Sequence, residues 1–565
     1  MFKNIIWVRI SCLVLLISAC DSSLKQGIDT AFINGGIYNS DESHTWSEAI
    51  GIDDGVIVIM GTNNEIKELI GTKTNVIDLQ DKMLMPSFHD GHAHVSYGGR
   101  DKIGCNINGR TSSMSTRQQL NECANNLNLK KDAWLTGGGW ELFDFPDGAP
   151  TSEMLDEIFG GRPVSLSDAF GHNLWVSSKA LELAGINSDT PNPPNGTIVR
   201  DLNTGKPSGT LRDSAMNIML KVLPELTVEQ QYKSLLVGIE EANKFGITAF
   251  IEPGVDQPLA RLYKNLEDNE DLNARVMLAL SPMKALPGSV GPELFDLLAE
   301  REQYRGQYLN PDSVKIYIDG VIETQTSNML EPYNDGSNFP PFYNQKELDE
   351  LFQRLDEMKV QIHTHAIGDG AIRNALDAFE YALLQNGSND NRHLIVHLQL
   401  IDKEDQSRFG ELNVAANFQC LWCYPDPYIG FAEESVGKDR VERFYPVRSL
   451  QKVGALLVGG SDWSVTSLNP LEAIEAAVRR QDPYTMTGPT LGKNEEIDLY
   501  TALDMYTRNA AYVMRLDDKT GTIEVGKSAD IIVLDRNLFE IPVTEISEAK
   551  VLLTLMDGRE VYNSQ

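Results

Sequence analysis

Ten consecutive residues, Met85-Pro86-Ser87-Phe88-His89-Asp90-Gly91-His92-Ala93-His94, set the architecture that we expect for this chain. They continue a short apolar run, which predicts a buried strand with two histidines at its end. Residues two apart on an extended strand point to the same face, so His92 and His94 form a pair. Two imidazoles on one face can chelate a divalent metal ion. The pair predicts one part of a metal site whose other ligands must come from elsewhere in the chain.

Seven further short apolar runs follow and alternate with helical patterns. They lie at residues 247–252, 275–280, 313–320, 360–365, 393–397, 414–419 and 456–462. Eight strand–helix units favour a closed parallel (β/α)8 barrel, a TIM barrel, whose chemistry sits at the carboxyl ends of its strands. We place this barrel at residues 85–509. The Gly-, Pro- and Asn-rich residues from about 125 to 235 then form an inserted subdomain.

Both ends of the chain consist of short strands and turns. Residues 28–84 contain Asp54-Gly55 before an apolar run, and residues 510–565 contain Asp557-Gly558 between two runs. Asp-Gly is a strong hairpin-turn signal. Neither end is large enough to fold alone, so we expect one composite β-sandwich built from both termini. The predicted fold class is therefore α/β: a barrel, a composite sandwich and an inserted subdomain.

The first residues of the chain indicate a processing segment. Lys3 precedes the apolar run Ile10–Ile17, and Ser18-Ala19-Cys20 follows, as in a secretory signal. The ending resembles the lipobox of bacterial lipoproteins, which implies a signal peptide at residues 1–19 and a lipid on Cys20; an ordinary signal peptide is the alternative. Asp21 resembles an inner-membrane retention signal. We expect a lipid-tethered protein in the cell envelope that faces the periplasm; Asp21 favours the inner membrane, and the choice of membrane stays open.

Composition narrows the range of partners. The formal net charge is −32, which argues against nucleic acid and anionic lipid surfaces. No run reaches about 20 continuous apolar residues, so the predicted membrane contact is the lipid anchor alone. The expected partner is a small-molecule substrate, and a homodimer remains open.

Four cysteines remain besides Cys12 and Cys20. They allow three disulfide pairings in an oxidising compartment: Cys105, Cys123, Cys420 and Cys423. Proximity along the chain favours Cys105–Cys123 with Cys420–Cys423. The latter two could also be half of a zinc site, but no second Cys or His pair lies near them in the sequence.

Polar residues recur where the predicted barrel strands end. Singly, each has an ordinary explanation: a buried histidine is usually hydrogen-bonded in a core, a lysine can pair with a nearby acid, and an aspartate can cap a helix. Together they form a set that chance would rarely place at one end of a barrel. The set is His92, His94, Lys315, His365, His397 and Asp462.

These motifs resemble the amidohydrolase superfamily, and within it the amidohydrolase-3 group of YtcJ-like metal-dependent hydrolases. The resemblance runs from about residue 30 to the end of the chain. The segments that carry it are Pro86–His94, Val314–Gly320, His365–Asp369, Gly460–Trp463 and Gly526–Asp530.

The resemblance implies a role for each residue of the set. His92 and His94 would hold one divalent ion, most simply zinc, and His365 and His397 a second; one or two ions remain open. Lys315 would carry a CO2-derived carbamate that bridges them, because a free ammonium has no lone pair to offer. Val396 departs from the family pattern, which usually has Glu before the histidine of this strand. His363 competes with His365, which we prefer because it lies in the His-Ala-Ile-Gly-Asp match.

The implied activity is hydrolysis of an amide, N-acyl or N-formyl carbon–nitrogen bond, other than a peptide bond, by a metal-activated water. Asp462 would bind metal and act as general base and then acid. Cyclic-amide opening or deamination by the same centre is the alternative, and a non-catalytic binding lipoprotein is a third. We name His172, Trp463 and Arg443 as candidates for substrate contact, and as a possible aromatic wall Tyr333, Trp422 and Tyr424.

Overall fold

The computed structural model describes residues 27–107, 115–126, 132–169, 171–193, 196–224, 226–282 and 290–564. The predicted signal peptide, Cys20 and Asp21 lie outside these residues. In the described part of the chain, no helix is both long and apolar enough to cross a membrane.

The central element is a barrel of eight parallel strands in chain order. The strands are β8 (Phe88–Asp90), β15 (Ile247–Val255), β16 (Arg275–Leu280), β17 (Leu309–Tyr317), β18 (Gln361–Ala366), β19 (Leu394–His397), β20 (Ala415–Phe418) and β21 (Leu457–Gly459). The gap between the first and last strands is bridged by backbone hydrogen bonds from Gly91 N to Gly459 O (2.8 Å) and from Asp462 N to His92 O (2.7 Å). All eight predicted strands are confirmed, and with them the barrel.

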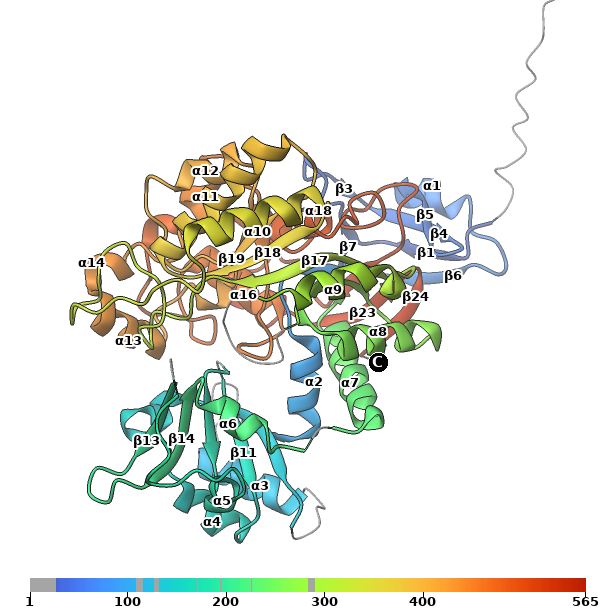
Figure 1. Cartoon of the computed structure of the whole chain (residues 1–565). Helices are drawn as coiled ribbons and strands as arrows, with labels where there is room; N and C mark the ends of the chain where they lie inside the picture. Colours follow the sequence, from blue (N-terminus) through green and yellow to red (C-terminus); the bar gives the residue numbers. More distant parts are fainter. Residues whose placement is uncertain are drawn as a thin grey trace, which may run out of the picture.

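Helices cover the outside of the barrel (Figure 1), and the apolar side chains of its strands are buried. Between β15 and β20 they are α8 (Gln257–Asp268), α9 (Glu293–Glu300), α10 (Gln345–Glu357), α11 (Asp369–Asn386) and α12 (Gln406–Glu411). After β20 come α13 (Pro427–Val436), α14 (Lys438–Val441), α15 (Val447–Lys452), α16 (Pro470–Arg479), α17 (Leu499–Met505) and α18 (Arg508–Val513). Several begin at side-chain caps; Asn344, for example, accepts from Glu347 N in a capping box that starts α10.

Two further sheets are built from the ends of the chain, and only the six-stranded one combines strands from both ends. One has the order β5-β4-β1-β6 and the other β24-β23-β22-β7-β2-β3. The amino-terminal strands are β1 (Thr30–Ile33), β2 (Gly36–Tyr38), β3 (Trp46–Ser47), β4 (Ala49–Asp53), β5 (Val56–Gly61), β6 (Asn75–Asp78) and β7 (Met83–Pro86), with the short helix α1 (Asn63–Lys67). The carboxyl-terminal strands are β22 (Ile531–Leu534), β23 (Val551–Met556) and β24 (Arg559–Asn563).

The two predicted Asp-Gly hairpins are confirmed, and their turns touch each other. Asp54 and Asp557 have φ angles of 47° and 48°. Gly55 has a φ of +76°, and a Cβ there would lie 2.4 Å from the carbonyl oxygen of Asp557. The turns therefore need glycine both for the backbone conformation and for the close approach.

The motif that opens the barrel also joins it to these sheets. Strand β7 ends at Pro86 in the six-stranded sheet, and β8 starts the barrel two residues later. Arg275, the first residue of β16, reaches from the barrel to the carboxyl-terminal strands, and its Nε lies 2.7 Å from Asp530 Oδ2. The stretch from Met85 to His94 therefore spans the seam between the barrel and the six-stranded sheet.

The chain between the first two barrel strands, β8 and β15, forms a separate lobe beside the barrel (Figure 1). Its sheet has the order β13-β14-β12-β11-β10-β9. The strands are β9 (Cys105–Asn106), β10 (Leu135–Trp140), β11 (Val164–Asp168), β12 (Asn173–Val176), β13 (Gly196–Arg200) and β14 (Pro207–Asp213). The helices are α3 (Thr116–Asn126), α4 (Ser152–Phe159), α5 (Ser178–Leu183) and α6 (Met216–Leu220).

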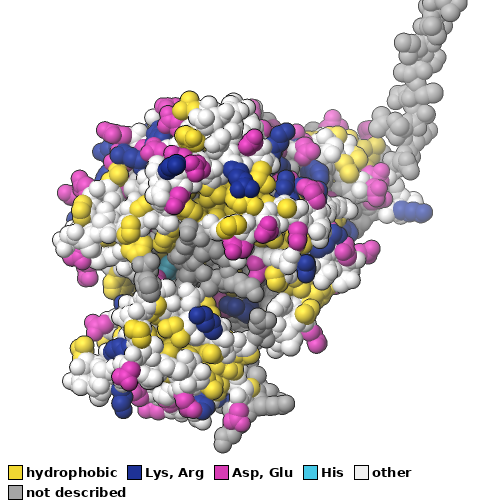
Figure 2. Space-filling view, in the orientation of Figure 1, with side chains coloured by type: hydrophobic (Ala, Val, Ile, Leu, Met, Phe, Trp, Pro, Cys, Tyr) yellow, Lys and Arg dark blue, Asp and Glu magenta, His cyan; other side chains and the backbone are white. Residues whose placement is uncertain are grey.

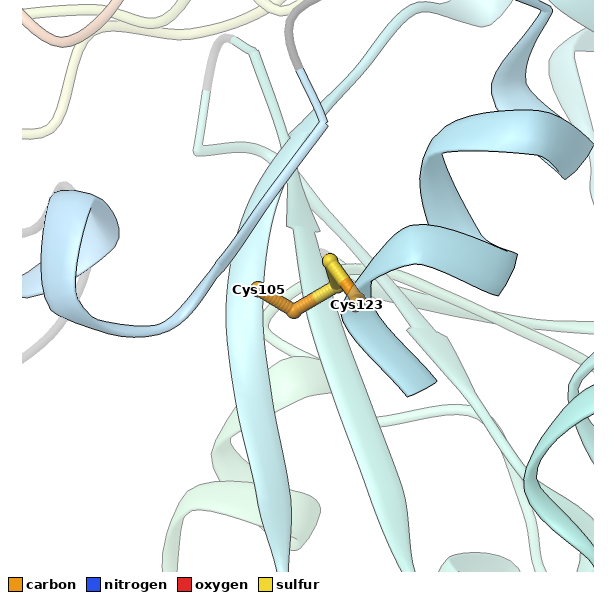
Figure 3. Close-up of a disulfide and its surroundings, with 2 residues drawn as sticks. All are labelled: Cys105 and Cys123. Atoms are coloured by element: carbon orange, nitrogen blue, oxygen red, sulfur yellow. A yellow bond between two sulfur atoms is a disulfide. The ribbon is translucent and has the colours of Figure 1, made fainter. Parts of the chain in front are cut away.

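The bounds of this lobe differ from the expected 125–235. The lobe begins at Cys105 because β9 pairs with β10, and Cys105 is bonded to Cys123 of α3 (Figure 3). After it, α7 (Val228–Lys244) leads into β15 and packs against α2 (Val95–Ile103), the helix that follows the His-x-His motif. The contact is close: a Cβ on Gly99 would lie 1.9 Å from Ser234 O.

One of the two favoured disulfides is confirmed and the other is wrong. Cys105 and Cys123 are bonded, with their Cα atoms 5.4 Å apart. Cys420 and Cys423 are free thiols, both buried. They lie in and just after the 3-10 turn Cys420–Trp422, where Cys423 N donates to Cys420 O at 3.0 Å. Cys420 and Cys423 are close in the sequence and in the fold, but they do not form a disulfide.

Candidate metal centre

The first and last barrel strands are joined at their carboxyl ends by a buried carboxylate. Asp90 Oδ1 accepts from His92 N at 3.0 Å and from Ser461 N at 3.0 Å. His94 N donates to Trp463 O at 2.7 Å. These bonds hold the loop after β8 against the loop after β21, so the side chains of His92, His94 and Asp462 face one another.

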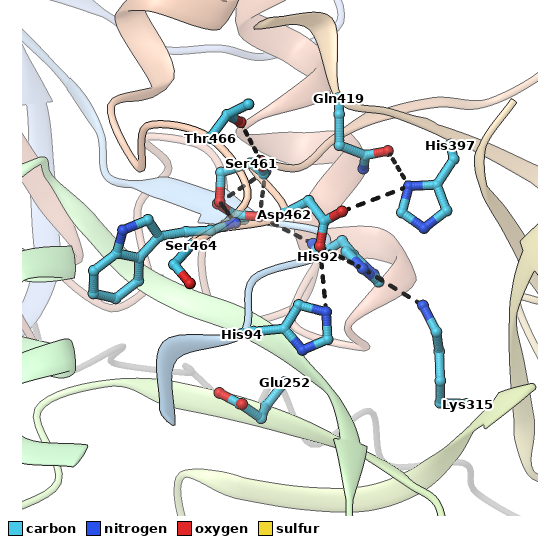
Figure 4. Close-up of polar contacts among 12 residues, drawn as sticks. His92, His94, Glu252, Lys315, His397, Gln419, Ser461, Asp462, Ser464 and Thr466 are labelled. Atoms are coloured by element: carbon cyan, nitrogen blue, oxygen red, sulfur yellow. Dashed lines mark hydrogen bonds and ion pairs between the residues drawn. The ribbon is translucent and has the colours of Figure 1, made fainter. Parts of the chain in front are cut away.

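Three donor atoms converge at this point (Figure 4). Asp462 Oδ1 lies 3.2 Å from His92 Nε2 and 3.2 Å from His94 Nε2. The three donor atoms lie within 4.8 Å of one another. His92 is fully buried, and Asp462 is 6% exposed. The first histidine pair and the predicted base, separated by some 370 residues in the chain, therefore share one point in space.

Lys315 enters the same space from β17. Its Nζ lies 3.5 Å from His92 Nε2, and its side chain is buried. Burial lowers the pKa of Lys315 to about 7, against the opposing charge of Asp462. A lysine that loses its proton near neutral pH has a lone pair for chemistry that an ammonium cannot perform.

His365 and His397 form a second group beside the first. Their ring centroids are 4.5 Å apart, and His397 Nδ1 lies 3.9 Å from Asp462 Oδ2. Gln419 Oε1 lies 2.8 Å from His397 Nδ1, and Trp422 stacks on the same ring at 5.5 Å. A proton on Nδ1, donated to Gln419, leaves His397 Nε2 free to act as a ligand. Asp462 thus faces one histidine group with each of its oxygens.

His363 also belongs to the centre, in a role that the sequence did not predict. From the sequence His363 was only an alternative to His365 as a metal ligand, since both side chains enter the barrel from β18. In the structure His363 Nε2 lies 2.6 Å from His92 Nδ1, whereas His365 Nε2 lies 3.3 Å from Gly320 O. The two histidines of β18 therefore have different neighbours: the ring of His365 contacts that of His397, and His363 contacts the Nδ1 atom of His92.

The chemistry of this donor set fits a divalent cation. Burial lowers the pKa of His92, His363 and His397 well below the ordinary value, which favours neutral imidazoles. Burial would raise the pKa of Asp462, but the hydrogen bond with His94 and the charges around it lower that pKa instead, so the carboxylate is ionised. Neutral imidazole nitrogens and an ionised carboxylate are the donors that zinc and similar ions take in proteins.

Comparison with known proteins decides the family. The family model described as "Amidohydrolase family" matches residues 75–562. The chain belongs to the amidohydrolase family. It is 29% identical to the putative amidohydrolase YtcJ of Bacillus subtilis (strain 168), over 94% of this chain and 98% of that protein. It is 26% identical to an N-substituted formamide deformylase of Arthrobacter pascens, over 95% and 98% of the two chains.

A solved relative agrees in fold. A metal-dependent hydrolase from Pyrococcus furiosus superposes with a TM-score of 0.69 at 26% identity, covering 90% of this chain and 99% of that one. The family places this amidohydrolase among the hydrolases, and its structural relatives include metal-dependent enzymes. The family resemblance predicted from the motifs is confirmed.

A cavity of about 470 Å³ lies between the inserted lobe and the barrel mouth of the amidohydrolase. Figure 2 shows the hollow between these two parts. His172 and Asp213 line it from the lobe, and Glu323 lines it from the loop after β17. His172 Nδ1 lies 3.0 Å from Asp213 Oδ1, and although burial opposes it, this contact raises the pKa of His172. Burial raises the pKa of Glu323 to about 7.

The other candidates for substrate contact lie away from this cavity. The Trp463 ring packs on α2, where a Cβ on Gly98 would lie 2.6 Å from it. Arg443 lies after α14, where its charge lowers the pKa of Asp369 against the larger effect of burial. Tyr333 bonds to the backbone of Ser327. Neither Trp463 nor Arg443 is among the residues that line the cavity around His172.

Proposed function

We propose that this amidohydrolase is a metal-dependent hydrolase of a carbon–nitrogen bond of the amide, N-acyl or N-formyl type. The observation that carries the proposal is the convergence of His92 Nε2, His94 Nε2 and Asp462 Oδ1 within 4.8 Å in a buried site. His92, His94 and Asp462 would hold one divalent ion, most simply zinc. When bound, such an ion would lower the pKa of a water to about 7 and polarise a substrate carbonyl.

Asp462 is the group that would move protons. Its oxygens face two different histidine groups, and its lowered pKa keeps it ionised and ready to accept a proton. In the hydrolysis we propose, Asp462 takes a proton from the attacking water and returns it to the leaving nitrogen. One carboxylate then serves as base and acid, and no serine or cysteine nucleophile is required.

Lys315, His365 and His397 would extend the centre to a second ion. The neutral form of Lys315 can attack CO2 at carbon, forming an N–C bond and releasing a proton, to give a carbamate with two oxygens in place of an amine. Lys315 Nζ lies 3.5 Å from His92 Nε2, and Asp462, which contacts His92 on one side, lies 3.9 Å from His397 Nδ1 on the other; this closeness of the two histidine groups supports a bridging carbamate.

The substrate would enter by the cavity at the barrel mouth. His172, held at Nδ1 by Asp213, presents its other nitrogen for a hydrogen bond to the substrate. One relative, the N-substituted formamide deformylase of Arthrobacter pascens, favours a substituted formamide or another N-acyl amine as the substrate. The volume of about 470 Å³ suits a small molecule.

The test is hydrolysis by the zinc-loaded full chain. N-formyl and N-acyl amines would be compared with cyclic amides and amino-heterocycles, using wild type and Asp462→Asn. We expect the wild type to hydrolyse the open-chain amides and the variant to lose at least about 10²–10⁴-fold in kcat, because Asp462 is both the proposed general base and a proposed zinc ligand. Turnover of the ring substrates alone would move the assignment to ring opening or deamination. Full activity in Asp462→Asn would contradict the mechanism, and no turnover of any substrate would favour a binding protein.

We propose further that the mature chain is tethered to the inner membrane, facing the periplasm, through a lipid on Cys20. The sequence Ser18-Ala19-Cys20-Asp21 supports this. Fractionation of cells that express wild type or Cys20→Ala tests it: the wild type is expected with the inner membrane and the variant in the soluble periplasm. Equal distribution of the two would contradict the anchor.

A further inference from the structure

The shortest contact between two imidazoles of the metal centre joins a proposed ligand to a residue with no assigned role. His92 Nδ1 lies 2.6 Å from His363 Nε2. The two rings are nearly parallel, with centroids 4.8 Å apart and 20° between their planes. Both side chains are fully buried, so water does not compete for the contact. A nitrogen–nitrogen distance this short requires one proton between the two atoms.

The other ring nitrogen of His92, Nε2, determines which of the two rings carries that proton. His92 Nε2 lies 3.2 Å from Asp462 Oδ1 and points to the space shared with His94 Nε2. To bind a metal ion there, Nε2 must carry a free lone pair, so a neutral His92 has its proton on Nδ1. His92 Nδ1–H then donates, and His363 Nε2 must accept.

His363 fulfils this requirement at a cost. If its Nε2 accepts, its own proton sits on Nδ1, and within the described residues His363 Nδ1 has no hydrogen-bond partner. A buried donor without a partner is unfavourable, and an apolar side chain at this position would avoid it. Packing alone therefore does not explain a histidine at this position.

We propose that His363 is a positioning residue, which accepts the Nδ1–H of His92 and thereby fixes the tautomer and ring orientation in which His92 Nε2 faces the metal. The inference rests on the proposed metal centre. It also separates the two histidines of β18: His365 lies beside His397 as a candidate ligand, while His363 acts only through His92. Partners of this kind hold ligating histidines in place, and their loss typically weakens metal binding by about 10–100-fold.

Two substitutions at one position test the inference. His363→Gln keeps an acceptor, the Oε1 atom, whereas His363→Leu has a similar size and accepts nothing. The matched control is His89→Leu, which removes another fully buried barrel histidine whose Nδ1 contacts only Ser87 O at 3.1 Å. For each full-length variant, zinc affinity would be measured by chelator competition, the Co(II) visible spectrum recorded, and the melting temperature of the metal-free protein determined.

We expect His363→Leu to bind zinc about 10–100-fold more weakly with an altered Co(II) spectrum, while His363→Gln and His89→Leu stay near the wild-type affinity. Wild-type affinity in His363→Leu, or equal losses in the Leu and Gln variants, would overturn the inference and leave the proposed function standing. A wild type that binds no zinc would overturn both.

A second measurement covers the case in which the Leu variant does not fold. Long-range ¹H–¹⁵N spectra of zinc-loaded wild type labelled with [¹⁵N]histidine report which nitrogen of each ring carries the proton. We expect His92 protonated at Nδ1 and His363 also at Nδ1. A proton on His363 Nε2 would contradict the inference.

Discussion

Replacing Arg275 by methionine tests how the barrel is joined to the composite sheets. Arg275 is 4% exposed, its Nε lies 2.7 Å and its Nη2 3.2 Å from the two oxygens of Asp530, and it also pairs with Asp557. The side chain of Asp530 is fully buried. The methionine variant would leave that carboxylate in the interior without its counter-charge.

The size of the effect follows from this burial. Removing one partner of a buried ion pair costs about 3–5 kcal/mol, whereas removing one partner of an exposed pair costs about 0–1 kcal/mol. For a chain of this length, an unfolding entropy of roughly 1 kcal/mol per kelvin converts the larger loss to about 3–5 °C in melting temperature. Arg305, 38% exposed and paired with Glu302 and Asp312, is the matched control.

The assay is thermal unfolding followed by circular dichroism, with zinc affinity measured alongside. Arg275→Met is expected to melt about 3–5 °C below wild type, Arg305→Met within about 1 °C of it, and both to keep wild-type zinc affinity because neither contacts the metal centre. The double variant Arg275→Met/Asp530→Asn should recover part of the loss. If Arg275→Met and Arg305→Met melt together, the buried pair does not stabilise the seam and the reasoning is refuted.

Three further predictions concern single features of the molecule. With a pKa of about 7, the Lys315 amine is about nine-tenths neutral at pH 8 and about one-tenth at pH 6, so ¹³C NMR with labelled bicarbonate should detect a carbamate at pH 8 that fades toward pH 6; none at pH 8 contradicts this. Gln419→Leu, which removes the acceptor at His397 Nδ1, should weaken zinc binding about 10–100-fold in chelator competition, and Gln419→Glu should not; equal losses count against the assignment. Reducing Cys105–Cys123, with a sequence separation of 18, should destabilise the inserted lobe by about 3 kcal/mol in urea unfolding; unchanged protease resistance of the lobe would contradict that.

The fold followed from the sequence because its signals are local and repeated. Alternating apolar runs and helical patterns gave all eight barrel strands, and two Asp-Gly turns gave both hairpins. The start of the inserted lobe was less accessible. Strand β9 has only two residues, Cys105–Asn106, and exists because it pairs with β10 and is bonded through Cys105 to α3. A two-residue strand has no recognisable sequence pattern, so β9 could not be predicted without knowing that it lies beside β10.

Some residues of the candidate site could likewise be predicted from the sequence, and others could not. His92, His94 and Asp462 could be found because each ends a predicted strand, and parallel strands bring such ends together. The roles of His363 and Gln419 could not, because they depend on which nitrogen of a neighbouring ring each one meets. Spacing in sequence showed that His363 and His365 share a face of β18, but only the geometry separates their contacts. The Cys420–Cys423 pairing failed for a related reason: closeness along the chain does not fix whether two thiols are bonded.

The most direct test of the central claim is the metal content of the purified full chain. Wild type, His92→Asn/His94→Asn and Asp462→Asn would be dialysed against trace zinc and analysed by inductively coupled plasma mass spectrometry, with folding checked by circular dichroism. The convergence of the three donor atoms predicts one or two zinc ions per wild-type chain, and a clear loss of zinc in both variants. A folded wild type without bound metal, or a folded double variant that keeps the full complement, would contradict the proposal that His92, His94 and Asp462 form the metal centre of this amidohydrolase.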